Sequence, residues 1–193
     1  MSHSIASASQ LLVENLSLIK NSVGDQGVLD LACGKGRNGL YLLQNSIPVT
    51  FVDKNEEVLE SVAQSIEYLA QDKAKAKLEN SSSLASAKCW QVDLEQGDIS
   101  SLQAQCFDVV LVFNYLHRPL LPQIEQIIAK AGLIFYETFT VQQPIYGRPT
   151  NPDYLLKQNE LLEVFSDWEV INYFEGVKSD PDRAVASLIA RKN

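Results

Sequence analysis

The residues best suited to chemistry surround a glycine-rich turn within residues 28–39, Val-Leu-Asp-Leu-Ala-Cys-Gly-Lys-Gly-Arg-Asn-Gly. A short apolar strand is expected to run into this turn, and a helix to begin directly after it. Glycine has no Cβ and tolerates positive φ, so such a turn lets a ligand approach the backbone closely. An acid, Asp53, follows at the end of the next apolar run. The pattern predicts a nucleoside-containing cofactor on the first strand-turn-helix unit.

Two cofactors fit this turn. Gly34, Gly36 and Gly39 match the dinucleotide pattern G-x-G-x-x-G, and Asp53 stands near the distance expected for a ribose-binding acid. The other cofactor is S-adenosylmethionine, and Asp30 distinguishes the two. A carboxylate beside a diphosphate is repelled at short range, whereas S-adenosylmethionine has no phosphate and carries a cationic ammonium and sulfonium. Asp30 therefore favours the methyl donor. The structural alternative is a buried turn residue that accepts hydrogen bonds from loop amides.

The turn resembles motif I of the class I methyltransferases, in the form D-x-x-C-G-x-G. Residues 30–38 are most similar to the tellurite-resistance methyltransferases and their small bacterial relatives, and the resemblance covers nearly the whole chain. Residues 115–119, 136–139 and 146–149 resemble a less characterised branch of similar proteins. Ala32 departs from the motif, which often has glycine there. We expect the small alanine to preserve the turn with a negative φ.

Short strands and helices alternate along the chain. Strands are expected at 28–32, 48–52, 88–92, 107–113, 132–137, 168–174 and 184–190, and helices at 9–20, 35–44, 55–70, 122–130 and 159–165. This alternation predicts an α/β fold with a parallel, doubly wound sheet. The last two strands have no helix between them and should form an antiparallel hairpin. The resemblance implies a Rossmann-like three-layer sandwich with a mostly parallel seven-stranded sheet. We expect one methyltransferase domain over residues 1–193, with an N-terminal helix within residues 1–22 packed on it.

Further acids follow the next strands. Asp53 is expected to accept both ribose hydroxyls, with a helix cap for residues 54–57 as the alternative. The resemblance implies that Asp93 contacts the adenine amino group and that Leu94 packs on the ring, and the alternative for Asp93 is a turn cap. Asn114 closes the fourth strand, where the methionine moiety should pass. The expected cofactor-binding set is Asp30, Ala32, Gly34, Gly36, Asn38, Asp53, Lys54, Asp93, Leu94 and Asn114.

Methyl transfer from a sulfonium mainly requires alignment of the reactants and exclusion of water. The candidate general bases are His117, Glu137 and Tyr115. His117 has a tunable pKa and follows the fourth strand, although a polar loop or cap position explains it equally simply. Soft nucleophiles such as thiolate, selenite or tellurite need less help from a base.

Two arginines, Arg118 and Arg148, are candidates to hold an anionic substrate, because guanidinium suits oxyanions. Tyr146 is a candidate for the pocket wall. Residues 139–153 form a long connection, which is typical of a lid or binding loop. The alternative for Arg148 is a surface ion pair, and Glu137 is a candidate to pair with one of the arginines.

Composition limits the possible functions. The net charge of −8 and pI near 4.8 oppose binding to nucleic acid. Three cysteines without ligand spacing and two histidines make a metal site improbable. No apolar run is long enough to cross a bilayer, and the first residues lack a signal-peptide pattern. We expect a cytoplasmic monomer or homodimer with reduced thiols and no membrane partner.

These features together predict an S-adenosylmethionine-dependent methyltransferase acting on a small molecule. The resemblance alone suggests a tellurite-like oxyanion or a small thiol as the acceptor. One alternative is an NAD(P)-dependent oxidoreductase, which would need diphosphate contacts despite Asp30, and the chain has no paired Tyr-x-x-x-Lys. The other alternative is a non-catalytic partner subunit with a methyltransferase fold.

Overall fold

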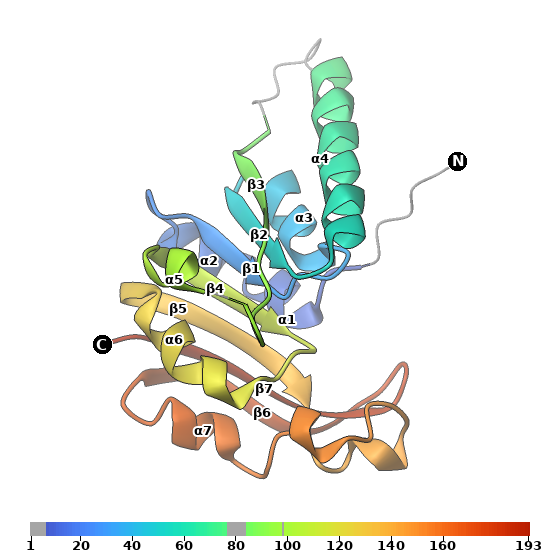
Figure 1. Cartoon of the computed structure of the whole chain (residues 1–193), viewed down its shortest axis with the longest axis vertical. Coiled ribbons are helices and arrows are strands. Elements are labelled where there is room, and N and C mark those ends of the chain that lie inside the picture. The colour runs from blue at the N-terminus through green and yellow to red at the C-terminus, as the bar shows by residue number, and fades with distance from the viewer. Residues whose placement is uncertain (1–6, 77–83, 98) are drawn as a thin grey trace. The chain divides into compact units, whose positions relative to one another are not determined.

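The computed structural model describes residues 7–76, 84–97 and 99–193. It divides into two compact units, residues 1–99 and 100–193, which are described separately below (Figure 1). The expectation of a single domain stays a prediction. In the described part of the chain, no helix combines the length and apolar character needed to cross a bilayer.

The first unit contains three parallel strands in the order β3-β2-β1, namely β1 (Val28–Leu31), β2 (Val49–Asp53) and β3 (Ala87–Gln91). Every residue of β1 is buried, as expected for a strand covered on both faces. The helices are α1 (Gln10–Glu14), α2 (Leu16–Ser22), α3 (Arg37–Gln44) and α4 (Glu56–Ala76). Close packing fixes the start of α3, because a Cβ on Gly39 would lie 2.3 Å from the Phe51 ring of β2.

The second unit contains four strands in the order β4-β5-β7-β6. They are β4 (Phe107–Phe113), β5 (Ile128–Phe139), β6 (Glu169–Lys178) and β7 (Arg183–Arg191). β4 and β5 are parallel, whereas β7 is antiparallel to both β5 and β6. The helices are α5 (Ser100–Gln103), α6 (Leu121–Gln126) and α7 (Glu160–Val164), and 3-10 turns span Arg118–Leu120 (η2), Gln143–Ile145 (η3) and Pro152–Tyr154 (η4). The predicted α/β class and the C-terminal antiparallel hairpin are confirmed.

Several elements differ from the sequence prediction. The N-terminal helix is broken at Asn15, whose side-chain amide donates to the carbonyl of Leu11 at 2.9 Å and competes with helix continuation. The helix expected at 122–130 ends at Gln126, because the following residues pair with β4 and begin β5. The short helix α5 was not predicted.

Candidate cofactor and acceptor sites

The loop between β1 and α3 adopts a left-handed backbone at three positions. Ala32, Gly34 and Gly36 have φ of 52°, 52° and 70°. The loop is tied to β2, because the amide of Cys33 donates to the carbonyl of Val52 at 2.9 Å. The prediction of a negative φ at Ala32 is therefore wrong. The strand direction and the tie to β2 fix the turn, and alanine adopts the conformation that the motif usually gives to glycine.

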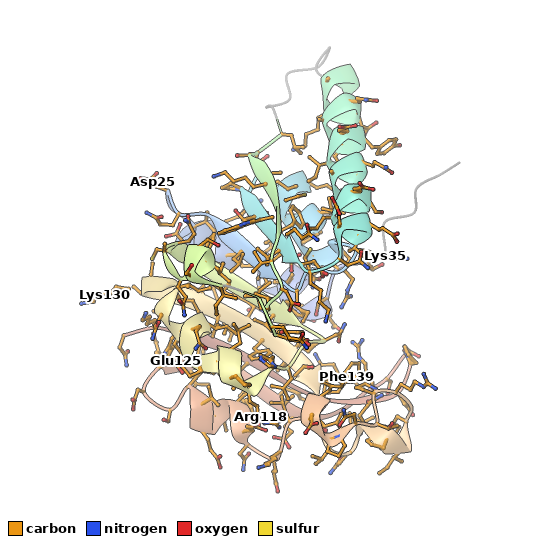
Figure 2. The ribbon with its side chains drawn as sticks, viewed as in Figure 1. Asp25, Lys35, Arg118, Glu125, Lys130 and Phe139 are labelled. Atoms are coloured by element: carbon orange, nitrogen blue, oxygen red, sulfur yellow. The ribbon has the colours of Figure 1, made fainter. Side chains whose placement is uncertain are left out.

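A Cβ on Gly34 would meet no atom within 4 Å, so the backbone there borders open space. Lys35 follows it and is exposed (Figure 2). A ligand can therefore approach the amide groups of this loop without meeting a side chain at Gly34.

Asp53 connects the end of β2 to this loop. Its Oδ2 accepts the amide of Gly34 at 2.9 Å, and its Oδ1 accepts the amide of Asn55 at 3.0 Å. The cap of α4 is Asn55, whose Oδ1 accepts the amide of Val58 at 3.3 Å. Asn55, and not Asp53, therefore caps α4. A carboxylate has about four acceptor positions, so half-buried Asp53 keeps two for a ligand.

Asp30 is buried, and its Oδ2 accepts the amide of Gly39 at 2.9 Å. Burial raises the pKa of this carboxyl to about 7, opposed by the hydrogen bond from Gly39 and by the charge of Arg37. The structure therefore gives Asp30 the role that the structural alternative assigned to it: it binds an amide in the first turn of α3.

Asn38 and Lys54, two further members of the expected cofactor set, have protein partners. The Oδ1 of buried Asn38 accepts the amide of Ser9 at 2.9 Å and so ties the N-terminal segment to α3. Exposed Lys54 pairs with Glu95 at 3.5 Å. The assignment of Asn38 and Lys54 to the cofactor site stays a prediction.

Asp93 and Leu94 follow β3. The Oδ1 of Asp93 accepts the amides of Glu95 and Gln96 at 2.9 and 3.1 Å, which is the turn-capping alternative, and Leu94 is buried. The amide of Val92 donates to the carbonyl of Asp53 at 3.0 Å. Asp53 and Asp93 therefore stand at the carboxyl ends of neighbouring parallel strands, as predicted.

In the second unit, Asn114 and Glu137 stand at the carboxyl ends of β4 and β5. The amide of Asn114 donates to the carbonyl of Glu137 at 2.8 Å, and Asn114 has a φ of 54° that turns the chain away from the strand. The Glu137 side chain is buried, and its Oε2 accepts Nζ of Lys178 at 2.5 Å. β6 brings Lys178 to Glu137, a pairing that was not expected, and the pairing of Glu137 with an arginine stays a prediction.

Tyr115 and His117 follow β4 directly. The carbonyl of Tyr115 accepts the hydroxyl of Tyr136 at 3.2 Å, and burial raises the pKa of Tyr136 so that this hydroxyl stays a donor. His117 occupies the N-cap position of η2, but its side chain makes no capping hydrogen bond. Its carbonyl accepts the amide of Leu120 at 2.9 Å. Both side chains thus lie at the carboxyl end of the strand, where the sequence placed them.

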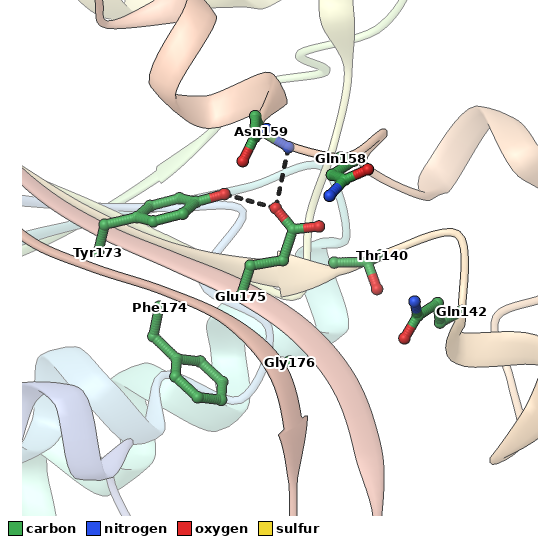
Figure 3. Close-up of a pocket in the computed structure, with 8 residues that line it drawn as sticks. All are labelled: Thr140, Gln142, Gln158, Asn159, Tyr173, Phe174, Glu175 and Gly176. Carbon is green, nitrogen blue, oxygen red and sulfur yellow. Dashed lines mark hydrogen bonds between the residues drawn. The ribbon is translucent and has the colours of Figure 1, made fainter.

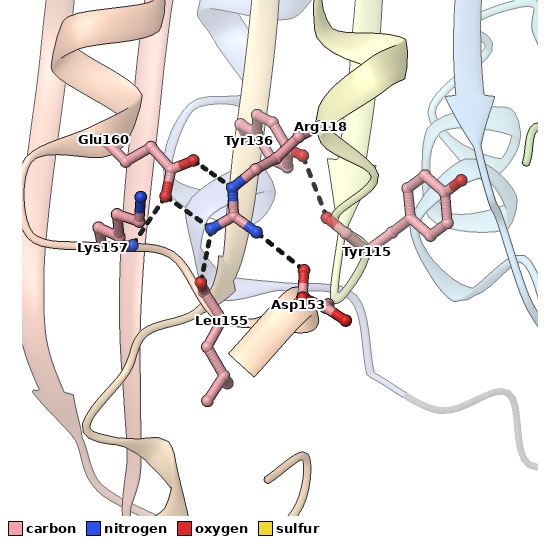
Figure 4. Close-up of polar contacts among 7 residues, drawn as sticks. All are labelled: Tyr115, Arg118, Tyr136, Asp153, Leu155, Lys157 and Glu160. Carbon is pink, nitrogen blue, oxygen red and sulfur yellow. Dashed lines mark hydrogen bonds and ion pairs between the residues drawn. The ribbon is translucent and has the colours of Figure 1, made fainter. Parts of the chain in front are cut away.

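Arg118 is occupied by the protein itself (Figure 4). Its Nε and Nη2 donate to the two carboxylate oxygens of Glu160 at 2.6 and 2.9 Å, and its remaining bonds reach the carbonyls of Asp153 and Leu155 at 2.9 and 2.8 Å. Although burial acts to raise it, the pKa of Glu160 is lowered by the bonds from Arg118. These internal partners were not expected, and the anion clamp at Arg118 stays a prediction. Through these bonds, Arg118 of η2 holds residues 153–160 in place.

Arg148 and Tyr146 are exposed on the connection between β5 and α7, as a binding loop requires. Buried Gln143 holds this loop in place. Its side-chain amide donates to the carbonyl of Arg148 at 3.0 Å, and its Oε1 accepts the amide of Ala184 at 2.8 Å. The first residues of β7 and the Arg148 backbone are therefore fixed to one side chain.

Comparison with known proteins gives the family. The profile of the family described as tellurite resistance protein TehB matches residues 13–180. The chain belongs to the TehB family. A relative from Haemophilus influenzae (strain 10810), described as "Probable S-adenosyl-L-methionine-dependent methyltransferase TehB", is 30% identical over 86% of this chain and 57% of its own length. The chain thus spans little more than half the length of this relative.

Solved structures show the fold of this TehB-family chain. The crystal structure of TehB from Haemophilus influenzae matches with a TM-score of 0.69 and 19% identity, covering 99% of this chain and 64% of that one. A magnesium protoporphyrin IX methyltransferase from Synechocystis PCC 6803 with bound S-adenosylmethionine matches with a TM-score of 0.60 and 18% identity, over 94% of this chain and 76% of that one. The predicted Rossmann-like methyltransferase fold is confirmed.

Two cations of this TehB-family chain were missed by the sequence analysis. Lys178 and Arg183 are paired in the register of β6 and β7, at the hairpin end of these strands. The Nε of Arg183 is buried and has no hydrogen-bond partner in the part of the chain that the structure describes. The only signal available in the sequence was their position in the polar connection expected between the last two strands.

Proposed function

We propose that this chain is an S-adenosylmethionine-dependent methyltransferase acting on a small anionic acceptor. The observation that carries the cofactor assignment is the loop after β1, where Gly34 has a left-handed backbone, borders open space and is held by Asp53. The names of the Haemophilus relative and of the Synechocystis structure with bound S-adenosylmethionine support the same cofactor. A dinucleotide would place a diphosphate at this loop, close to the carboxylate of Asp53.

In the first unit, the residues proposed to hold the cofactor lie in the loop after β1 and at the carboxyl ends of β2 and β3. The two remaining acceptor positions of Asp53 suit two ribose hydroxyls, and hydrogen bonds to a charged group contribute about 1.5–3 kcal/mol each. The loop residues Ala32, Gly34 and Gly36 line the approach with backbone. Asp93 and Leu94 stay proposed contacts because they follow β3, the next strand of this unit. Asn114 of the second unit also stays a proposed contact.

When bound, the cofactor supplies a methyl group on a sulfonium that is already activated for displacement. The chain's own residues have to bind the acceptor, orient its nucleophilic atom and exclude water. An acceptor that is anionic before it binds needs no general base. His117 and Tyr115 are the candidate bases for an acceptor that arrives protonated.

The acceptor is proposed to bind beside Arg183 and Lys178. Guanidinium and ammonium groups suit an oxyanion such as tellurite, or a thiolate. Glu137 forms an ion pair with Lys178, and the buried Nε of Arg183 has no hydrogen-bond partner among the described residues. Exposed Arg148 is the second proposed anion contact. We further propose a cytoplasmic monomer or homodimer that does not bind nucleic acid, consistent with the net charge of −8.

Calorimetric titration with S-adenosylmethionine, S-adenosylhomocysteine and NAD tests the cofactor. We expect the first two to bind and NAD not to bind. Saturable binding of NAD alone would overturn the proposal in favour of an oxidoreductase. Transfer of a labelled methyl group is then measured with tellurite, selenite and small thiols as acceptors. Binding without turnover on any acceptor would indicate the non-catalytic partner subunit.

A pair of variants tests the acceptor site. Arg183→Gln should raise the KM for the anionic acceptor by about tenfold, because a hydrogen bond to a charged group is lost, and should leave the Kd for S-adenosylmethionine unchanged. The matched control is Arg191→Gln at the other end of β7, where the arginine pairs with exposed Glu169 at 3.3 Å. Equal KM values in the two variants would remove Arg183 from the acceptor site.

A further inference from the structure

The second unit contains a hollow of about 510 Å³ that the proposed methyl transfer does not use. Three segments line it (Figure 3). Thr140 and Gln142 follow β5, Gln158 and Asn159 precede α7, and residues 173–176 belong to β6. Because β6 is the outer strand of its unit, one of its edges carries backbone groups that are not paired with another strand.

β7 supplies small side chains between β5 and β6 on the face of Glu175. Ala186 lies in register between Thr138 of β5 and Glu175 of β6. The carbonyl of Ala184, the next alanine on the same face, accepts the amide of Thr140 at 3.0 Å. Residues opposite one another in a sheet point to the same face, so the neighbour of Glu175 on β7 is the methyl group of buried Ala186.

This face is not the one that carries the proposed acceptor contacts. Successive side chains of a strand point to opposite faces, so Glu137 and Thr138 of β5 lie on different sides of the sheet. Glu137 forms its ion pair with Lys178 on one side. Glu175 shares the other side with Thr138. Glu175 and the Glu137–Lys178 pair therefore lie on opposite faces of the sheet.

Glu175 is held in a fixed position inside the hollow. Its Oε2 accepts the hydroxyl of Tyr173 at 2.5 Å and the amide of Asn159 at 2.9 Å. Burial, and then the bond to Glu175, raise the pKa of Tyr173, so its hydroxyl remains a donor. The other carboxylate oxygen, Oε1, points toward Thr140 and Gln158 in Figure 3 and has no hydrogen bond to any described residue.

The lining determines which ligand fits. None of its eight residues is a lysine or arginine, so the charge of Glu175 is not neutralised within the hollow. The amides of Gln142 and Gln158 and the hydroxyl of Thr140 offer both donors and acceptors around it. A divalent metal would need several anionic oxygens, and Glu175 is the single carboxylate of the lining. A positively charged ligand with neutral polar groups matches this set.

We propose that the hollow binds a small hydrophilic organic cation, a primary ammonium compound that also carries hydroxyl groups. The ammonium pairs with Oε1 of Glu175, and the hydroxyl groups bond to Thr140, Gln142 and Gln158. The net charge of −8 favours the approach of such a cation. This site is independent of the methyl-transfer proposal, because it uses neither the loop after β1 nor the Lys178–Arg183 pair.

The test is calorimetric titration of the full chain with glucosamine, with glucose as the probe that lacks the ammonium group. We expect saturable binding of glucosamine, and binding of glucose weaker by about tenfold or more. Glu175→Gln keeps an acceptor for Tyr173 and Asn159 but removes the charge. It should weaken glucosamine binding by about tenfold or more and leave glucose binding unchanged.

Two further variants distinguish the loss of a specific contact from the loss of the folded state. Glu163→Gln, at an exposed acid of α7, should bind glucosamine like the parent chain. Gln158 is an exposed residue of the lining. Gln158→Ala should weaken glucosamine binding by about threefold, as expected for the loss of a neutral hydrogen bond. The proposal is overturned by the absence of saturable glucosamine binding, by equal affinity for glucose, or by full glucosamine affinity in folded Glu175→Gln.

Discussion

The backbone N–H of Gly34 donates to Oδ2 of Asp53 at 2.9 Å, so the acid at the end of β2 holds the loop that follows β1. The same carboxylate is the proposed ribose acceptor. Asp53 therefore has two tasks in this proposal: it shapes the loop and offers acceptor positions beside it. Two substitutions of Asp53 distinguish these tasks.

Asp53→Ala removes both the loop contact and the ribose acceptors. We expect the Kd for S-adenosylmethionine, measured by calorimetry, to rise by more than about tenfold. Asp53→Asn keeps an oxygen for the amide of Gly34 and replaces the other acceptor with a donor, so its Kd should lie between those of Asp53→Ala and the parent chain. Glu57→Gln, at an exposed acid in the first turn of α4, is the matched control. Full affinity in Asp53→Ala would refute the ribose assignment.

The pH dependence of stability should depend on Asp30. Burial raises the pKa of its carboxyl from 3.8 to about 7 in the folded chain. Between these values the unfolded chain binds fewer protons than the folded one, so the free energy of unfolding falls as the pH rises. A pKa raised this far corresponds to a loss of up to about 4 kcal/mol. Asp30→Asn cannot ionise, and its oxygen can still accept the amide of Gly39.

Urea unfolding of the parent chain and Asp30→Asn, from about pH 4 to about pH 8, measures this effect as a difference. The variant should gain stability relative to the parent chain as the pH rises, and the gap should be constant above the folded-state pKa. Asp25→Asn, at an exposed acid, is the control and should follow the parent curve. Parallel curves for Asp30→Asn and the parent chain would show that Asp30 does not titrate in this range.

Arg118 is predicted to act in folding and not in acceptor binding. Arg118→Ala leaves Glu160, whose side chain is 12% exposed, without its partner and frees the carbonyls of Asp153 and Leu155. We expect a loss of about 2 kcal/mol in the free energy of unfolding at neutral pH. Because the pKa of Glu160 is lowered in the fold, the loss should diminish as the pH falls and the carboxylate is protonated.

The control for Arg118 is Arg191→Ala, whose partner Glu169 is 64% exposed. A surface pair of this kind contributes at most about 1 kcal/mol. The KM for the anionic acceptor should stay at the parent value in Arg118→Ala once the variant is shown to be folded at the assay temperature. A large rise in KM with unchanged stability would restore the anion clamp that the sequence suggested.

Features set by local chemistry were predictable from the sequence. The apolar run of β4 gave both ends of the strand, and the glycines at 34 and 36 predicted a turn with positive φ. The missing helix before β7 predicted the antiparallel hairpin. Each of these depends on residues adjacent in the chain, where periodicity and backbone preference act directly.

Side-chain partners were not predictable in the same way. Arg118 meets Glu160 across 42 positions, and Glu137 meets Lys178 across 41. Such pairs depend on strand order and register, and no local pattern in the sequence encodes them. The burial of the Arg183 Nε could not be predicted for the same reason. It depends on how β7 packs and not on the spacing of charged residues in the sequence.

Ala32 offers a test of backbone strain in the cofactor loop. An L-residue with left-handed backbone costs about 1–2 kcal/mol, whereas glycine adopts it freely. Part of this gain is offset because glycine gives the unfolded chain more freedom. Ala32→Gly should therefore raise the free energy of unfolding by about 0.5–1 kcal/mol, measured by urea denaturation, with no change in the Kd for S-adenosylmethionine.

Two other alanines calibrate this result. Ala131 has a φ of 60° and is exposed, so Ala131→Gly should stabilise the chain by a similar amount. Ala70 lies within α4, where glycine costs about 1 kcal/mol, so Ala70→Gly should destabilise it. If Ala32→Gly instead behaves like Ala70→Gly, the loop does not hold alanine in a strained conformation. The departure from the glycine of motif I would then carry no energetic cost, and the tie between Cys33 and Val52 would alone determine the turn.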